Sequence, residues 1–215
     1  MSWMKKIVIA SRNPGKIAEF RQLLAELPLE VLSLLDFPEI PEILESGLTF
    51  RENALLKART VTSYTGLTAL ADDSGLEVDY LGGAPGVYSA RYAGPECDDA
   101  ANNQKLLAEL AGVPLEKRTA RFRCVIAITT PRGEEFFCEG VCEGKIGYTP
   151  RGESGFGYDP LFIVPALGKT FAELGPEVKN RISHRAQAMR LAREILERLV
   201  GTNGEGKKDA NRGPE

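Results

Sequence analysis

Residues 67–76 read LTALADDSGL, an apolar run that ends in two adjacent carboxylates, a serine and a glycine. The apolar part is typical of a strand, and Asp, Ser and Gly are ordinary turn residues, so the plain interpretation is a strand that enters a polar turn. A second interpretation is a catalytic or metal site at the strand end. Neighbouring strand residues point to opposite faces, so Asp72 and Asp73 can serve one site only if the backbone turns. We therefore expect one of them to be structural and the other functional.

The segments before this stretch predict a strand, a turn and two helices. Residues 6–10 form an apolar run typical of a buried strand, and residues 11–15 predict a turn. A helix is expected from Lys16, because the next apolar residues have helical spacing. A second helix is expected near Thr49, which forms a capping-box pattern with Glu52.

The segments after it complete an α/β pattern. In chain order, we expect a Gly/Pro-rich loop at 82–95, a helix capped by Asp98 or Asp99, strands at 121–130 and 135–146 joined as a hairpin, a short strand at 161–164 and a last helix capped by Ser183. Early alternation followed by a hairpin predicts an α/β protein with a mixed sheet. Residues 1–200 are expected to form a single domain. Residues 201–215 lack an apolar pattern and are expected to be disordered.

Composition excludes some classes of function. The 215 residues carry a net charge of −3 with acids and bases interspersed, which gives no support for a nucleic-acid or membrane-surface partner. No stretch has the apolar length of a signal peptide or a membrane span, so we expect a cytoplasmic enzyme or binding protein. The four cysteines lack CxxC spacing and His184 is the only histidine, which argues against structural zinc.

The stretch SRNPGK, residues 11–16, lies between the first predicted strand and the first predicted helix. A helix N-terminus offers free N–H groups and partial positive charge, so it suits a phosphate. Gly15 lets the backbone approach a ligand, and Lys16 adds a point charge. The stretch does not satisfy the Walker A pattern. A capped turn with a solvated lysine explains it equally well.

Two later stretches contain further candidate ligand-binding groups. Residues 152–160, GESGFGYDP, do not match the dinucleotide fingerprint, but Phe156 or Tyr158 can pack against a base; a glycine-rich turn is the simpler alternative. Residues 183–185, SHR, open the last helix with Lys179 upstream. Together these donors favour contact with an anion or nucleotide, whereas a lone histidine is more often structural.

Four acids flank the second predicted helix and the strand after it: Glu45, Glu52, Asp72 and Asp73. Mg²⁺ prefers a few carboxylates plus waters and substrate phosphates, so one or two of these acids suffice. The capping box already explains Glu52, whereas Glu45 lies in a loop and is less constrained.

Five stretches, taken in order, resemble one family: SRNPGK, SGLTFRENALLKA, ADDSGLEVDYLGGAPGVYSARYAG, GFGYDPLF and SHRAQA. The chain resembles the inosine/xanthosine triphosphate pyrophosphatase family from about Ile7 to Leu199. These enzymes remove deaminated purine nucleotides from the precursor pool. The resemblance implies a homodimer and an elongated, two-lobed α/β fold. A long mixed β-sheet with flanking helices would form its frame, and the active-site cleft would lie between the lobes.

The resemblance also implies roles for individual residues. Asp73 would accept a proton and bind Mg²⁺, and Ser74 would contact the substrate. The implied residues on the phosphate side are Ser11, Arg12, Asn13, Pro14, Gly15, Lys16, Asn53, Lys57 and Lys179. The implied residues on the base and sugar side are Phe156, Gly157, Tyr158, Asp159, His184 and Arg185. Many members have two acids before the Thr/Ser-Gly that leads into the second helix; Leu44 replaces the first here, and we assign Glu45 as the second metal ligand.

The opening stretch then has a specific interpretation. We expect Asp73 to face the cleft where the backbone turns, and Asp72 to brace that turn by hydrogen bonds. The expected reaction is Mg²⁺-dependent hydrolysis of ITP, dITP and XTP at the α-phosphorus, which gives the monophosphate and pyrophosphate. Two alternatives stay open: a nucleotide-binding sensor without turnover, and a Maf-like pyrophosphatase acting on other modified nucleotides.

Overall fold

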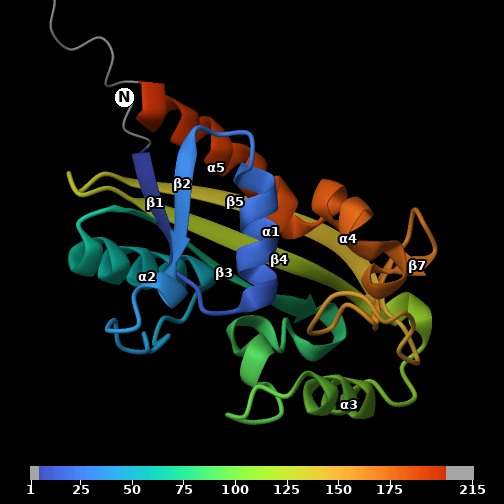
Figure 1. Ribbon diagram of the computed structural model, residues 1–215. Helices are drawn as coiled ribbons and strands as arrows, with labels where there is room; N and C mark the ends of the chain where they lie inside the picture. The colour runs from blue at the N-terminus through green and yellow to red at the C-terminus, as the bar shows by residue number, and fades with distance from the viewer. Residues whose placement is uncertain (1–4, 202–215) are drawn as a thin grey trace, which may run out of the picture.

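A mixed sheet is the frame of the computed structural model, which describes residues 5–201 (Figure 1). Within that range, the strands are hydrogen-bonded in the order β2-β1-β3-β4-β5-β6-β7. β1 is parallel to β2 and β3, and the later pairs are antiparallel. The predicted α/β class with a mixed sheet is confirmed. The strands are β1 (Lys5–Ile9), β2 (Leu29–Ser33), β3 (Thr68–Val78), β4 (Thr119–Thr129), β5 (Glu135–Ile146), β6 (Phe162–Val164) and β7 (Lys169–Thr170).

The helices start at capping residues that the sequence partly identifies. Thr49 and Glu52 form the expected capping box of α2, and Asp98 caps α3 by accepting from two backbone N–H groups. These contacts satisfy donors that the first helical turn leaves free. The α-helices are α1 (Pro14–Leu24), α2 (Phe50–Thr65), α3 (Asp99–Glu109), α4 (Phe171–Ile182) and α5 (His184–Gly201). The 3₁₀ helices are η1 (Leu34–Asp36), η2 (Asp79–Leu81), η3 (Gly86–Arg91) and η4 (Leu115–Lys117).

The helices cover both faces of the sheet, and Figure 1 shows α2 and α5 on opposite sides of it. On one face, α1 and α5 bury Phe20 and Met189 in a cluster with strand residues. On the other face, α2 buries Ala54 and Val61. A third cluster, which includes Phe171 of α4, lies where β3, β4 and β5 continue past the end of β1. The two aspartates of β3, Asp72 and Asp73, therefore lie buried between packed layers.

The expected turn inside residues 72–75 is wrong, because β3 continues through it to Val78. β3 pairs with β4 residue by residue from Ala69 to Val78, and this antiparallel ladder outweighs the local turn preference of Asp, Ser and Gly. Asp72 therefore braces no turn. Gly75 is required for packing, since a Cβ there would lie 2.4 Å from the carbonyl oxygen of Gly86.

Other boundaries also differ from the sequence expectations. β2 and α4 were not predicted, and α1 begins at Pro14 rather than at Lys16. Of the tail expected to be disordered, only Gly201 is described, at the end of α5; residues 202–215 lie outside the described range. Among the described helices, none combines the length and apolar character needed to cross a membrane. The single-domain boundary at residue 200 stays a prediction.

The close contact between α5 and β5 depends on a glycine. A Cβ at Gly140 would lie 2.1 Å from the carbonyl oxygen of His184 and 2.6 Å from the backbone nitrogen of Ala188. Any larger side chain would push the helix off the strand. Gly140 thereby lets the first turn of α5 lie directly on the sheet, with the SHR residues beside β3 and β4.

Candidate active site

Most of the predicted site residues line a pocket of about 210 Å³ at the point where β1 ends and β3 continues. β1 stops at Ile9, and the backbone N–H of Ala10 still bonds to Leu70 of β3. Beyond Leu70, the edge of β3 that β1 would cover is free to border the pocket. The lining includes Asn13, Lys16, Glu45, Asp73, Ser74, Phe156, Gly157, Tyr158, Asp159, Lys179, His184 and Arg185.

Asp73 lies on the α2 face of β3, among groups from α2 and the loop before it. Asn53 donates to its Oδ2 at 3.0 Å, and the Lys57 Nζ lies 3.5 Å from its Oδ1. Asn53 and Lys57 are four residues apart, so they share one side of α2. Lys57 also contacts Oε1 of Glu45 at 2.5 Å, and Arg91 lies 3.7 Å from Oε2 of Glu45. The structure thus brings together the two carboxylates that were assigned to a metal.

The two carboxylates respond differently to these surroundings. Burial raises the pKa of Asp73, and the nearby Lys57 ammonium offsets this only in part. Burial also acts to raise the pKa of Glu45, but there Lys57 outweighs it and the pKa is lowered. Asp73 is therefore more basic than an ordinary aspartate, which suits a group that accepts a proton.

Asp72 lies on the opposite face of the same strand. Its Oδ2 is 3.1 Å from Lys16 Nζ and 3.4 Å from Arg185 Nε. Ser74 donates to the same oxygen at 3.1 Å and itself accepts from Arg185 Nη2 at 3.1 Å. Burial acts to raise the pKa of Asp72, but Lys16 and Arg185 outweigh it and hold the pKa well below its usual range. Asp72 is a permanently ionised anchor for the cations of the site, and Ser74 shares its side of the strand.

The SRNPGK loop forms a capped helix start, as one interpretation predicted, but its lysine is not solvated, because Lys16 pairs with Asp72. Asn13 accepts from the backbone N–H of Lys16 at 3.0 Å and Pro14 occupies the first turn. Ser11 Oγ accepts from the backbone N–H of Asn13 at 3.1 Å. Arg12 turns away to donate to the carbonyl of Ile40. Only Asn13 and Lys16 of this loop line the pocket.

Gly15 joins this loop to the later glycine-rich loop. A Cβ at Gly15 would lie 3.2 Å from the ring of Phe156. The two loops are 140 residues apart in sequence, so nothing local predicts this contact. The absence of a side chain at Gly15 lets the Phe156 ring lie beside the start of α1.

The GFGYDP loop is held by one hydrogen bond within it and by others to neighbouring segments. Asp159 Oδ2 accepts from the backbone N–H of Phe156 at 3.1 Å, and the Gly157 N–H donates to Asp99 at 2.7 Å. The Tyr158 hydroxyl donates to the carbonyl of Ser89 at 2.8 Å, and its ring is buried. Tyr158 is therefore mainly a packing residue, and Phe156 offers the open aromatic ring.

Lys179 lies beside this loop rather than among the residues of the phosphate loop. Its Nζ is 2.7 Å from Asp159 and 4.5 Å from the centroid of the Phe156 ring. Glu19 of α1 lies 3.1 Å from the same Nζ and also pairs with Arg185. Sequence reasoning missed Glu19. Its spacing of three residues from Lys16 places both on one side of α1, which was the available signal.

His184 is buried at the first position of α5. Its ring stacks on Phe122 with centroids 4.8 Å apart and an interplanar angle of 13°. Burial, together with the charges of Arg185 and Lys179, holds its pKa well below the ordinary value, so the ring is neutral at pH 7. Its Nδ1 has no hydrogen-bond partner among residues 5–201, although the residue lines the pocket. This nitrogen is a buried polar atom left without a partner beside the pocket.

Comparison with known protein families shows which family the chain belongs to. The sequence model of the Ham1 family matches residues 7–195, which include all the pocket residues described above. The chain belongs to the Ham1 family. A dITP/XTP pyrophosphatase of Geobacillus kaustophilus is 54% identical over 201 residues, which cover 94% of this chain and 98% of the relative. These matches confirm the family resemblance inferred from the five stretches.

Solved Ham1 structures have the same fold. The Staphylococcus aureus Ham1 protein superposes with a TM-score of 0.81 at 44% identity and covers 90% of this chain and 98% of its own. A HAM1 protein from Coxiella burnetii gives a TM-score of 0.83 at 46% identity, over 90% of this chain and 99% of its own. The division into two lobes stays a prediction.

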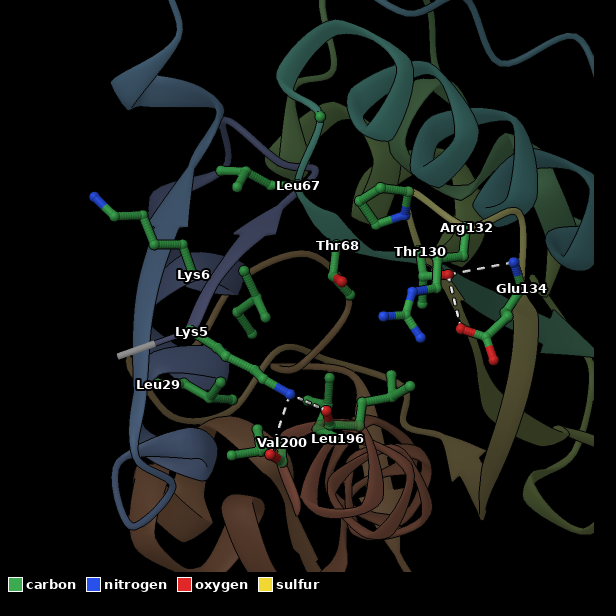
Figure 2. A pocket seen from close by; sticks show the side chains of 14 residues that line it. Lys5, Lys6, Leu29, Leu67, Thr68, Thr130, Arg132, Glu134, Leu196 and Val200 are labelled. Carbon is green, nitrogen blue, oxygen red and sulfur yellow. Dashed lines mark hydrogen bonds between the residues drawn. The ribbon is translucent and has the colours of Figure 1, made fainter. Parts of the chain in front are cut away.

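A larger pocket of about 370 Å³ lies at the opposite end of β1 (Figure 2). It is bordered by the start of β3, the turn between β4 and β5, and the last turn of α5. There Lys5 donates to the carbonyl of Val200 at 3.1 Å and to that of Leu199. Glu134 is its one acidic residue, and its lining contains none of the predicted site residues. The smaller pocket is therefore the candidate active site of this Ham1 protein.

Proposed function

We propose that this Ham1 protein is a Mg²⁺-dependent pyrophosphatase that converts ITP, dITP and XTP to the monophosphate and pyrophosphate. The observation that carries the proposal is Asp73. It is a buried carboxylate of raised pKa that lines the pocket, with Glu45 joined to it through Lys57. The relatives' name, dITP/XTP pyrophosphatase, supports the choice of substrates.

The donor set at Asp73 fits Mg²⁺. This ion takes oxygen ligands and is commonly held by one or two carboxylates together with substrate phosphates. Glu45 and Asp73 already converge on one cation, the Lys57 ammonium. Within residues 5–201 no group of three or more His, Cys, Asp or Glu side chains is arranged to hold a metal, so phosphates and water would complete the shell. Bound there, Mg²⁺ would offset phosphate charge and polarise the phosphorus that is attacked.

The pocket has two chemically different ends. Lys16 and the start of α1 supply positive charge suited to phosphates. Phe156, the neutral imidazole of His184 and the Arg185 guanidinium supply a flat ring and directed donors, which suit a purine and its 6-oxo group. Lys179 lies against Phe156 and Asp159, so we now place it between the two ends.

The chemistry needs one proton acceptor and one leaving group. Asp73 would accept a proton from the attacking water as the water oxygen bonds to the α-phosphorus. The bond from the α-phosphorus to the bridging oxygen breaks, and its electron pair leaves with pyrophosphate. A carboxylate is a weak base at pH 7, so the raised pKa of Asp73 and the positioning of the water both contribute.

The decisive experiment follows isotope from water into product. Purified protein is incubated with ITP and Mg²⁺ in H₂¹⁸O, and the products are analysed by ³¹P NMR. We expect pyrophosphate and IMP, with ¹⁸O in IMP. Orthophosphate as the first product, or ¹⁸O in pyrophosphate, would refute attack at the α-phosphorus. Binding of ITP without any product would instead identify a nucleotide sensor.

A substrate panel tests the specificity. ITP, dITP and XTP should react far faster than ATP and GTP, and EDTA should abolish the reaction. Comparable turnover of GTP and ITP would refute the specificity, and preference for other modified nucleotides would favour a Maf-like activity. We also propose that the protein is cytoplasmic and forms a homodimer. Light scattering on the purified chain tests the homodimer.

A further inference from the structure

Lys57 occupies the position between the two carboxylates that the proposed function assigns to the metal. Its Nζ lies 2.5 Å from Glu45 Oε1 and 3.5 Å from Asp73 Oδ1. The Lys57 side chain is only 10% exposed, so solvent screens these contacts little. The Lys57 ammonium, which carries a single positive charge, thus already bridges the two carboxylates.

The other oxygen of each carboxylate has a different partner. Asp73 Oδ2 accepts from Asn53, and Glu45 Oε2 faces Arg91. Both carboxylates therefore keep a partner if the ammonium leaves. The two oxygens that face Lys57 are the pair that would become available together to another cation.

Substrate phosphates would offer the Lys57 ammonium an alternative partner. Glu45 and Asp73 line the same pocket as Lys16, where the phosphates are expected. A lysine ammonium sits on a flexible four-carbon stem and is a good point-charge partner for phosphate. Substrate phosphates would therefore both deliver the metal and attract the ammonium away from the carboxylates.

We infer that the Lys57 ammonium is a placeholder for the metal in the free enzyme and exchanges with it when the nucleotide enters. The inference rests on the proposed function and adds an order to it. Divalent metal alone competes with Lys57 for Asp73 and Glu45 and binds weakly. Metal and triphosphate together bind well, because the phosphates take over Lys57. The binding of the two ligands is coupled through one side chain.

The first test measures metal binding without any nucleotide. Mn²⁺ alone is titrated into wild type, Lys57→Met and Lys16→Met, and free Mn²⁺ is followed by EPR. Lys57→Met should bind Mn²⁺ about tenfold tighter than wild type or better. Lys16→Met is the matched control: it also removes a nearby ammonium, but one that pairs with Asp72. Its gain should be clearly smaller. Equal gains in both variants, or no gain in Lys57→Met, would overturn the exchange.

The second test needs no variant, so it holds even if Lys57→Met does not fold. A crystal structure of the wild type with Mg²⁺ and a non-hydrolysable ITP analogue should show Lys57 Nζ away from both carboxylates and on a phosphate. An ammonium still bridging Glu45 and Asp73 would overturn the inference. If wild type turns over ITP while either test fails, the exchange alone is wrong. If wild type has no ITP turnover, the proposed function fails and the exchange fails with it.

Discussion

The two faces of β3 treat two adjacent aspartates in opposite ways. On one face, Asp72 contacts two cations, Lys16 and Arg185, and its pKa falls well below the usual range. On the other, Asp73 contacts one ammonium and one amide, and burial raises its pKa. Both residues are aspartates on the same strand, and they are buried to almost the same extent. The difference comes from which helices contact each face.

The comparison shows how a strand can divide labour between neighbours. Side chains alternate across a strand, so consecutive residues sample two unrelated environments a few ångströms apart. The face covered by α1 and α5 makes Asp72 a fixed negative anchor for cations. The face covered by α2 leaves Asp73 the more basic carboxylate, and so the one suited to take a proton.

The largest expected effect is on catalysis at Asp73. Asp73→Asn keeps the shape and loses the carboxylate that we propose as proton acceptor and metal ligand, so kcat/KM for ITP should fall by about 10³ or more. Steady-state kinetics measure the loss, and circular dichroism checks the fold. An Asp73→Asn variant that keeps a tenth of the activity would remove Asp73 from the role of base.

The next effect is on stability at Asp72. Asp72→Asn leaves buried Arg185 and Lys16 short of a counter-charge, and breaking a buried ion pair costs about 3 kcal/mol of unfolding free energy. Urea unfolding at pH 7 measures it. The kcat/KM of the folded fraction should fall less than in Asp73→Asn. Equal catalytic losses in two fully folded variants would erase the distinction between the faces.

A Lys16 variant tests whether a cation that pairs with Asp72 also binds the substrate phosphates. Lys16→Ala should lower kcat/KM by about tenfold, the effect of one charged hydrogen bond, for ITP and ATP alike, because both carry the same phosphates. Lys6→Ala is the control, since Lys6 makes only an exposed pair with Glu30 at 3.0 Å. A changed ratio of ITP to ATP turnover would place Lys16 near the base instead.

The smallest expected effect is on the pH dependence of stability, which should have opposite signs for Asp73 and Asp72. An unfolded Asp titrates near pH 3.9. Because the folded pKa of Asp73 is raised, its contribution to stability is present below about pH 3.9 and is lost as pH rises through the folded pKa. Because the folded pKa of Asp72 is lowered, its contribution is present above about pH 3.9 and is lost as pH falls through the folded pKa.

Metal-free urea unfolding between pH 4 and pH 7 can resolve this sign. Relative to wild type, Asp73→Asn should gain stability as pH rises, whereas the deficit of Asp72→Asn should stay nearly constant, because its contribution is already present at pH 4. Parallel curves for the two variants would show that the two faces are electrostatically alike.

Sequence patterns located this site better than they described its geometry. The stretches around Asp73, Phe156 and His184 do meet at one pocket, as the family resemblance implied. The expected turn at Asp72 was wrong, because local preference carries no information about the β4 partner that holds β3 extended. Ser74 lines the pocket, so its expected contact with the substrate stays a prediction, but its hydrogen bond to Asp72 was not expected.

Long-range charge pairs escaped sequence reasoning for the same reason. Asp72 and Arg185 are 113 residues apart, and their contact requires both β3 and α5 to be in place. Glu19 lies on an ordinary helix face until Lys179 and Arg185 are folded against it. α4 was missed because Gly175 and Pro176 interrupt its helical pattern and kink the helix.

The hydrogen bonds from Lys5 to the last turn of α5 have a consequence for protein engineering. Lys5 is separated in sequence from Leu199 by 194 positions and from Val200 by 195. The hydrogen bonds therefore make the beginning of β1 and the end of α5 neighbours in space. A circular permutant can therefore link residue 200 to residue 5 through a short linker and open new termini in the exposed turn at Pro131–Gly133. That turn contributes no residue to the active-site pocket, so the order of the chain can change while the site is kept.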